Sequence, residues 1–267
     1  MKKLNFDLAL ITGATSGLGK ELARQLAKEK ISLFLTGRNE SELNTLKEEL
    51  SSLTTVTIFP CDLTNPQERK HLTSEIYEKA PDLVINNAGS GLYGPALSYP
   101  TKDQLKTFEL NLNAPVEITL DAARALQSKA KPGTILNISS IAAYFTFPNF
   151  AAYASSKVAL KNFSKSLDSE LEGSGIRSLV SCPGRIHTDF ARRASQGKFT
   201  PSPKDAMEVS YAAKSVLNQI AKGKGNNIFG PRYFFFVLIT RFVPEKIMNK
   251  IFKKKLSQRT QDQHLQK

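Results

Sequence analysis

Short apolar runs alternate along the chain with amphipathic stretches of helical length. The runs are continuously apolar, as expected of strands that are buried on both faces. Predicted strands cover Leu8–Thr12, Ile31–Thr36, Thr55–Phe59, Leu83–Asn86, Thr134–Ser139 and Ile176–Ser181. Predicted helices cover Gly17–Lys30, Glu40–Leu50, a segment after Pro66, about Lys102–Lys129 and about Ala151–Glu172. Repeated strand–helix units of this kind predict an α/β fold with one doubly wound, Rossmann-like parallel sheet and helices on both faces.

A length of 267 residues suits one such domain with a large core. No internal repeat or low-complexity linker divides it. Residues 1–228 are expected to form the nucleotide-binding and catalytic domain, followed by an aromatic and basic extension over residues 229–267. The first apolar run contains Asp7 and breaks at Gly13, which is unlike a signal peptide, so we expect the chain to start in the cytoplasm.

The formal net charge of +13 is compatible with an anionic partner. The common nucleic-acid-binding motifs are missing, so nucleic acid is not an expected partner. Cys61 and Cys182 lie at predicted strand ends and are expected to be buried and reduced. The three histidines are scattered, and no Cys/His cluster has metal-ligand spacing, so no metal site is expected.

A glycine-rich segment, Thr12–Gly19, joins the first predicted strand to the first predicted helix. Glycines in this context allow the backbone to turn tightly and to approach a pyrophosphate, and the helix N-terminus offers free N–H groups to the anion. The residues expected to contact the cofactor here are Gly13, Ser16, Gly17, Leu18 and Gly19.

Arg38 follows the second predicted strand, where many NAD-dependent enzymes carry an acidic residue that binds the ribose 2′-hydroxyl. An arginine there can bind a 2′-phosphate by bidentate hydrogen bonds and charge. This pattern favours NADP(H), although a solvated loop arginine is the alternative interpretation.

Tyr153 and Lys157 lie four residues apart in a predicted helix and therefore share one face of it. A phenol has an ordinary pKa of about 10, and a nearby ammonium is expected to bring that pKa toward neutral pH. Ser140 ends a buried strand, from which its hydroxyl can reach a substrate oxygen. Taken alone, such a Tyr/Lys pair is usually a helix-surface pair.

These segments together resemble the ordered motifs of the short-chain dehydrogenase/reductase family. The resemblance rests on Thr12–Gly19, Asn86–Gly89, Ser140, and Tyr153 with Lys157, and it covers about residues 5–190. It implies that Tyr153 exchanges a proton with the substrate oxygen and that Lys157 lowers the Tyr153 pKa and binds the nicotinamide ribose. Ser140 would orient the carbonyl. Asn111 would anchor a water in a proton relay, with Asn113 as a rival for that role.

The same resemblance implies further cofactor contacts along the chain. Asn87 and Gly89 would lie beside the adenosine half of the cofactor, and Asp62 with Leu63 near the adenine. In the segment Cys182–Thr188, Thr188 would meet the nicotinamide carboxamide, and Pro183, Gly184 and Ile186 would lie along the cofactor. His187 is interpreted as a solvent-facing loop residue, with a second acid–base role as the alternative. Family members that prefer NADP often carry a basic residue just before the middle glycine of the phosphate loop, and this chain has Ser16 at that position.

The expected activity is therefore NADP(H)-dependent reduction of a ketone or aldehyde, with a lipophilic or acyl-chain compound among the candidates. The alternatives are an NAD(P)-dependent alcohol or sugar dehydrogenase working oxidatively, and a non-catalytic nucleotide sensor or scaffold. The segment of about residues 190–202 corresponds to the family's substrate lid and is basic, which is compatible with an anionic substrate or with a solvated loop. The resemblance implies a homodimer or homotetramer.

The C-terminal extension combines an apolar stretch, Tyr233–Thr240, with a lysine-rich segment, Glu245–Leu256. Eight apolar residues are too few to cross a bilayer, which takes about 20. On a helix, Ile247, Met248, Ile251 and Phe252 would share one face, as in an amphipathic helix that lies on a membrane. We therefore expect contact with the inner face of a membrane through residues 229–256, or packing of this segment on the domain or a second subunit.

Overall fold

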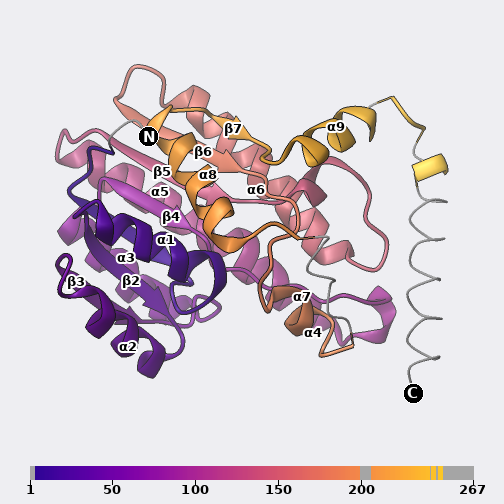
Figure 1. The fold of residues 1–267 in the computed structure, drawn as a ribbon, viewed down its shortest axis with the longest axis horizontal. Helices are drawn as coiled ribbons and strands as arrows, with labels where there is room; N and C mark the ends of the chain where they lie inside the picture. Colours follow the sequence, from indigo (N-terminus) through magenta and orange to yellow (C-terminus); the bar gives the residue numbers. More distant parts are fainter. Residues whose placement is uncertain (1–3, 199–205, 241, 245, 249–267) are drawn as a thin grey trace.

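A computed structural model describes residues 4–198, 206–240, 242–244 and 246–248 of the chain. Strands and helices alternate along it, as the hydrophobic pattern predicts (Figure 1). The strands are β1 (Leu8–Thr12), β2 (Ser32–Gly37), β3 (Val56–Pro60), β4 (Leu83–Asn86), β5 (Gly133–Ile138), β6 (Ile176–Ser181) and β7 (Asn226–Asn227). The helices are α1 (Gly17–Lys28), α2 (Glu40–Leu50), α3 (Pro66–Lys79), α4 (Thr101–Phe108), α5 (Ala114–Ser128), α6 (Ala151–Glu170), α7 (Phe190–Ala194), α8 (Val209–Ala221) and α9 (Pro231–Thr240).

The strands form one parallel sheet in the order β3-β2-β1-β4-β5-β6-β7. The chain winds outward from β1 in one direction and from β4 in the other, so the order reverses between these two strands. In open α/β sheets a crevice forms at this reversal, outside the carboxyl ends of the strands. The predicted doubly wound sheet is confirmed, and its switch point locates the expected ligand site.

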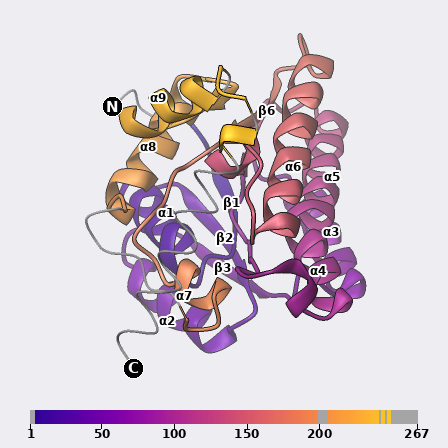
Figure 2. The same cartoon turned by 90° about the vertical axis from the view of Figure 1, so that its right-hand side faces the viewer.

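Helices cover both faces of the sheet, and each layer encloses its own core (Figure 2). One core lies beneath α1, α2 and α8, where leucines such as Leu22, Leu26 and Leu43 are fully buried. The other lies beneath α3, α5 and α6 and includes Leu72, Ile76 and Ile118. Because strands between two such layers have no solvated face, their sequences are continuously apolar.

The expected helix over 102–129 is not uniform. α4 and α5 are joined by a π-helical turn, Glu109–Asn113, that places Asn111 at 0% exposure. Buried Arg69 of α3 braces this turn, because its guanidinium pairs with Glu109 at 2.6 Å and with Glu117 at 2.7 Å. Single π turns inside α-helices frequently occur at functional sites.

The sequence patterns predicted neither α8 nor β7, which consists of two asparagines. Beyond β7, helix α9 lies at the periphery of the molecule and packs on the 3-10 turn Ile141–Tyr144 (Figure 1). Within the described residues, every helix is too short or too polar to cross a membrane. The predicted amphipathic segment lies mostly outside the described residues, since Ile251 and Phe252 fall there.

Candidate active site

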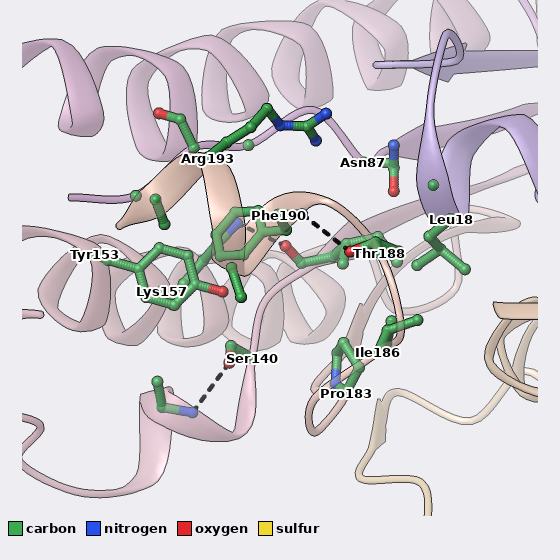
Figure 3. Close-up of a pocket in the computed structure, with 18 of the residues that line it drawn as sticks. Leu18, Asn87, Ser140, Tyr153, Lys157, Pro183, Ile186, Thr188, Phe190 and Arg193 are labelled. Atoms are coloured by element: carbon green, nitrogen blue, oxygen red, sulfur yellow. Dashed lines mark hydrogen bonds between the residues drawn. The ribbon is translucent and has the colours of Figure 1, made fainter. Parts of the chain in front are cut away.

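A cavity of about 1700 Å³ follows the carboxyl ends of β1 to β6. Single drug-sized ligands fill about 300–1,000 Å³. The cavity is therefore large enough for an extended cofactor together with a second molecule. Figure 3 shows Leu18 and Asn87 on one side of it and Ser140, Tyr153 and Lys157 on the other.

The glycine-rich segment turns directly from β1 into α1, and its shape requires glycine. Gly13 has a φ of +64°, and a Cβ there would lie 2.9 Å from the Ala88 Cα. A Cβ on Gly19 would overlap the Gly13 carbonyl oxygen and the Asn87 amide. Ser16 caps α1 without a side-chain hydrogen bond, and the first turn carries no acidic residue. The helix N-terminus therefore presents its N–H groups and positive dipole end to the cavity.

Asn87 supports this loop from β4. Its amide donates to the carbonyl oxygens of Thr12 at 3.0 Å and of Gly13 at 3.1 Å. In return, the Thr12 hydroxyl accepts from the backbone N–H groups of Asn87 and Ala88, both at 3.0 Å. Asn87 and Gly89 both line the cavity, and the Asn87 side chain also fixes the shape of the phosphate loop.

Arg38, directly after β2, also lines the cavity. Its side chain is exposed and makes no hydrogen bond or ion pair with the described residues, so the guanidinium is available to a ligand. Gly37 places the backbone against Thr15, whose methyl would lie 3.0 Å from a Cβ at position 37. Arg38, Thr15 and Ser16 thus gather at one end of the cavity.

Asp62 lies between two residues that line the cavity, in the loop after β3. Cys61, Leu63 and Thr64 line the cavity, whereas the Asp62 carboxylate accepts from the Thr64 N–H at 2.9 Å and the Thr64 hydroxyl at 2.8 Å. Burial acts to raise the pKa of Asp62, but the Thr64 hydrogen bonds and the charges of Arg38 and Lys106 outweigh it and lower that pKa. The carboxylate therefore shapes the loop beside Leu63 and remains ionised.

The catalytic candidates meet on the side of the cavity opposite Leu18 and Asn87. β5 delivers Ser140, and α6 delivers Tyr153 and Lys157 one helical turn apart (Figure 3). The Ser140 oxygen accepts from the Ala142 N–H at 3.1 Å and the hydroxyl hydrogen-bonds to Tyr153. The Lys157 ammonium donates to the Ile138 carbonyl oxygen at 2.9 Å and lies 5.8 Å from the centroid of the Tyr153 ring.

A buried polar network holds β5 against α6. The Asn86 amide donates to Asn137 at 2.9 Å, and the Asn137 amide donates to the Ser164 hydroxyl at 3.0 Å. The Ser139 hydroxyl donates to the Lys157 carbonyl oxygen at 2.8 Å. These buried hydrogen bonds tie β5 to α6 and so position Ser140 relative to the helix that carries Tyr153, while the Asn86 amide oxygen has no partner among the described residues.

The ionisation of the pair differs from the expectation. Burial raises the pKa of Tyr153 to about 12, against the opposing effect of the Ser140 hydrogen bond. Burial likewise lowers the pKa of Lys157 to about 8. The expected lowering of the Tyr153 pKa by Lys157 is thus wrong for the protein alone, because desolvation dominates and the ammonium is directed to the Ile138 carbonyl. The phenol keeps its proton at neutral pH.

Asn111 and its rival Asn113 are clearly separated by the π turn. The Asn111 amide oxygen accepts from the Ser90 N–H at 2.9 Å, and its nitrogen donates to the Ser90 carbonyl at 2.8 Å. A Cβ on Gly89 would lie 3.2 Å from the Asn111 oxygen and 3.6 Å from the Lys157 nitrogen, so both residues flank Gly89. Asn113 is exposed and bonds Glu109 instead. The structure therefore brings Asn111, and not Asn113, to the catalytic candidates.

The segment after β6 closes the middle of the cavity. Pro183, Gly184, Ile186 and Thr188 all line it, and the Thr188 methyl lies 3.0 Å from the position of a Cβ on Gly17. His187 points elsewhere: half of its side chain is exposed, and its Nδ1 lies 3.9 Å from Glu208. The interpretation of His187 as a loop residue outside the site agrees with this position.

Aromatic side chains to which the sequence assigned no part in the site surround Tyr153. The Phe150 ring stacks on Tyr153 with centroids 4.3 Å apart, and Phe190 of α7 lies 5.5 Å away on another side. The wall continues with Tyr93, Phe145, Phe147, Tyr233 and Phe236. The available signal was the aromatic density of Tyr144–Phe150 directly after Ser140.

The lid helix α7 is folded over this wall. The Tyr93 N–H donates to the Ala194 carbonyl at 2.7 Å, which joins the lid to the loop after β4. Arg192 is exposed and pairs with Asp189 at 3.2 Å, whereas Arg193 lines the cavity (Figure 3). Of the two arginines of α7, only Arg193 therefore lines the cavity. Residues 199–202 of the predicted lid lie outside the described residues.

Both cysteines are buried free thiols, as expected. Burial raises the pKa of Cys61 to about 12 and also raises that of Cys182. Among the described residues, no group of His, Cys, Asp and Glu has the arrangement of a metal site.

The chain is similar in sequence to known proteins. Residues 7–198 match the family model of short chain dehydrogenases. Sulfoacetaldehyde reductase 2 of Chromohalobacter salexigens is 32% identical over 187 residues, which cover 69% of this chain and 74% of that protein.

Solved structures of the same type share the fold. A short-chain dehydrogenase from Sphingobium yanoikuyae in complex with NADPH superimposes with a TM-score of 0.79 at 23% identity, over 91% of this chain and 95% of that one. A short chain dehydrogenase/reductase from Burkholderia phymatum in complex with NAD gives a TM-score of 0.76 at 21% identity, over 89% and 93% of the two chains. The chain belongs to the short-chain dehydrogenase/reductase family of oxidoreductases.

Proposed function

We propose that this protein reduces a ketone or aldehyde with NADPH and that Tyr153 donates the proton to the carbonyl oxygen. The observation that carries the proposal is the arrangement along one cavity. A glycine-rich turn and Arg38, which has no partner among the described residues, line one part of it, and Ser140, Tyr153 and Lys157 line another. The nicotinamide cofactor, when bound, supplies the hydride that adds to the carbonyl carbon. The residues of the chain bind the cofactor, orient the substrate and protonate its carbonyl oxygen.

The cofactor half fits a dinucleotide in its donors and its shape. The glycine positions leave open the space that side chains would fill, and the N-terminus of α1 meets that space. Arg38 supports NADP(H) over NAD(H). Its guanidinium has no partner among the described residues, so it can bind the 2′-phosphate that NADP(H) carries and NAD(H) lacks. The NADPH-bound relative is consistent with this preference, and the NAD-bound relative is a reason to test it.

The reactive half supports proton donation. A Tyr153 pKa of about 12 keeps the phenol protonated at neutral pH, which is the form that a reduction needs. Ser140 already accepts from the Ala142 N–H, so its own proton is directed toward Tyr153 or a substrate oxygen. As the Tyr153 O–H bond breaks, its proton forms the new O–H bond of the alcohol. The Ser140 hydrogen bond and the Lys157 ammonium then stabilise the phenolate that remains.

The aromatic wall favours an apolar substrate. Phe150 and Phe190 contact Tyr153 from two sides, so a carbonyl that reaches the phenol must pass between apolar surfaces. Displacement of water from such a surface favours lipophilic groups next to the carbonyl. We therefore propose a lipophilic ketone or aldehyde as the substrate class.

Cofactor titration of the purified protein with NADPH and NADH tests the proposal, with Arg38→Ala beside the wild type. A charge-assisted hydrogen bond is worth about 1.5–3 kcal/mol, so we expect the variant to lose NADPH affinity by roughly 10- to 100-fold and NADH affinity hardly at all. Arg124→Ala, at an exposed arginine that pairs with Asp121 on α5, is the matched control. Equal binding of both cofactors by the wild type contradicts the NADP assignment and favours the oxidative dehydrogenase alternative.

A further inference from the structure

The outer face of α9 and of the segment that follows it is unusually apolar. Of the eleven large hydrophobic side chains that are exposed in the described part of the chain, six lie between positions 234 and 247. They include Phe235 at 59%, Ile239 at 56% and Phe242 at 81% exposure. We call this set the outer face; its members are Phe234, Phe235, Leu238, Ile239, Phe242 and Ile247. Contiguous exposed apolar surface of this kind marks an interaction site.

The inner face of the same helix is already packed against the domain. Val237 is 3% exposed, and the Phe236 ring meets Phe145 edge-on at 5.3 Å. Tyr233 lies directly over Gly184, where a Cβ would overlap its ring. The orientation of α9 is therefore fixed by its inner face, and the outer face has no covering element among the described residues (Figure 2).

Charge distinguishes between the two kinds of surface that would cover the outer face. Residues 229–267 contain nine Lys and Arg against two acidic residues, which accounts for more than half of the net charge of +13. Arg232 and Lys246 are exposed at the two ends of the outer face. A second copy of the chain would bring like charges together, whereas anionic lipid headgroups would neutralise them.

We propose that the outer face of α9 docks on an anionic lipid bilayer, with the helix in the plane of the membrane surface. A helix of ten residues is too short to cross a bilayer, but aromatic and aliphatic side chains on one face with flanking cations are the features of an interfacial helix. Phe and Leu side chains enter the boundary of the acyl chains, and the lysines and arginines bind headgroups.

This docking bears on the substrate, in a step that rests on the proposed function. Tyr233 and Phe236 of the inner face line the cavity, while their neighbours Phe234 and Phe235 face outward. The thickness of a single helix, α9, therefore separates the bilayer from the aromatic wall around Tyr153. A lipophilic carbonyl dissolved in the membrane would reach the site past α9 without crossing water.

Vesicle flotation tests the docking without any need for catalysis. The full-length protein is mixed with phosphatidylcholine vesicles, or with vesicles that also contain phosphatidylglycerol, in low and high salt. We expect binding to the anionic vesicles, weakened by salt, and a loss of binding on the order of tenfold or more in the double variant Phe235→Ser/Ile239→Ser. The control Leu97→Ser/Leu105→Ser removes two leucines that lie outside α9 and are at least as exposed, and it should bind as the wild type does.

Two further measurements separate the possible outcomes. NADPH titration of both double variants reports folding of the cofactor half and should be unchanged, because none of the four residues lines the cavity. Molar mass from light scattering should be the same for wild type and Phe235→Ser/Ile239→Ser; a wild-type oligomer that this variant dissociates would show that a second copy covers the face, and would overturn the proposal. So would equal flotation of the two double variants.

Activity assays then distinguish this inference from the proposed function. If the protein reduces a water-soluble carbonyl but fails to bind vesicles, the docking fails alone. If it binds vesicles through Phe235 and Ile239 but does not oxidise NADPH in the presence of any carbonyl compound that is tested, the proposed function fails alone.

Discussion

The two ends of the cavity are built in opposite ways. The cofactor end consists of backbone: glycine turns, a helix N-terminus and carbonyl groups that Asn87 holds in place. The substrate end consists of side chains, mostly aromatic, that come from the segment after β5, from α7 and from α9. Ser140, Tyr153 and Lys157 lie where the two ends meet (Figure 3).

This difference follows from what each end has to recognise. A dinucleotide presents the same phosphates and riboses to every enzyme that binds it. Backbone groups in a glycine-rich turn can bind them, and such a turn is recognisable as a short sequence motif. A substrate is recognised by shape and polarity, which exchangeable side chains on separate loops supply. The first kind of site is therefore recorded in short motifs and the second is not.

The largest expected effect comes from Tyr153→Phe, which removes one hydroxyl at the junction of the two ends. Proton transfer by a positioned side chain contributes roughly 10²- to 10⁴-fold, so we expect kcat for carbonyl reduction to fall by about that factor. Titration with NADPH should give the wild-type affinity, because the ring and its stacking on Phe150 remain. Tyr77→Phe, at an exposed tyrosine of α3, is the control. Substantial turnover by the Tyr153→Phe protein would mean that another group donates the proton.

The same small substitution at each end then tests the comparison directly. In Gly19→Ala the new methyl would overlap the Gly13 carbonyl and the Asn87 amide, so α1 has to move away from the phosphate loop. Overpacking of this kind costs about 1–3 kcal/mol, and we expect NADPH affinity to fall by roughly 10- to 100-fold with a lower melting temperature. Gly173→Ala, where the methyl meets nothing within 4 Å, controls for the loss of backbone freedom. Unchanged affinity in Gly19→Ala would contradict the backbone cradle.

In the middle of the cavity, Gly184→Ala tests the contact with the substrate end, because the three atoms nearest to the new methyl all belong to the Tyr233 ring. A side chain can rotate where a backbone carbonyl cannot, so we expect NADPH affinity within about twofold of wild type and a KM for a lipophilic carbonyl raised by roughly tenfold. Parallel titration and steady-state kinetics measure the two quantities. A loss of cofactor affinity as large as that of Gly19→Ala would show that the two ends are not independent.

The sequence predicted the cofactor end and the junction better than the rest. One cavity is lined by most of the glycine-rich segment (Gly13 and Thr15–Leu18) and by Ser140, Tyr153 and Lys157. Each of these positions depends on local geometry: a turn after a strand, a strand end, and two helix positions four apart. The sheet followed for the same reason, since strands buried on both faces have an unmistakable apolar pattern. Asn111 was chosen over Asn113 from local pattern alone, and the π turn separates them as expected.

What the sequence did not predict depends on contacts between distant segments. β7 consists of two asparagines and becomes a strand only by pairing with β6. The π turn at Glu109–Asn113 lies between two α-helices, so the sequence pattern there is that of one long helix. The ion pairs that brace the turn come from Arg69 of α3, which is distant in sequence. The raised Tyr153 pKa arises from burial by Phe150 and its neighbours, which spacing between Tyr153 and Lys157 does not report. In the sequence, the aromatic residues of this wall look like ordinary core residues. Only the fold shows that the segment after β5, α7 and α9 bring them together around the cavity.

Phe190→Ala addresses that wall with a smaller effect. The ring lies 5.5 Å from the Tyr153 ring and comes from the lid, so its loss removes apolar contact with substrate and leaves the proton donor in place. We expect KM for a lipophilic carbonyl to rise by roughly 3- to 10-fold, and kcat/KM for a small hydrophilic carbonyl to change little. Phe163→Ala on α6 removes a half-buried phenylalanine that does not line the cavity and is the matched control. Equal losses for both substrates would argue against apolar recognition by the lid.

The smallest effect concerns the charge of Lys157 at the junction. Burial lowers the pKa of this residue from 10.5 to about 8, so above about pH 8 the folded protein has released a proton that the unfolded chain still binds. Stability rises with pH wherever the unfolded state binds more protons. The wild type should therefore gain about 1 kcal/mol relative to Lys157→Met between about pH 8 and pH 9, a window below the range where Tyr153 titrates.

Urea denaturation at several pH values measures this difference, and Lys165→Met, at an exposed lysine of the same helix, should track the wild type. The comparison with each variant cancels the titration of all other groups that the substitution does not perturb. A gain of the expected sign would show that the junction holds its ammonium in an apolar setting, where the protein itself disfavours the charge that stabilises a Tyr153 phenolate. A difference that stays constant over this window would mean that solvent reaches Lys157, and the wall around Tyr153 would then be too open to select an apolar substrate.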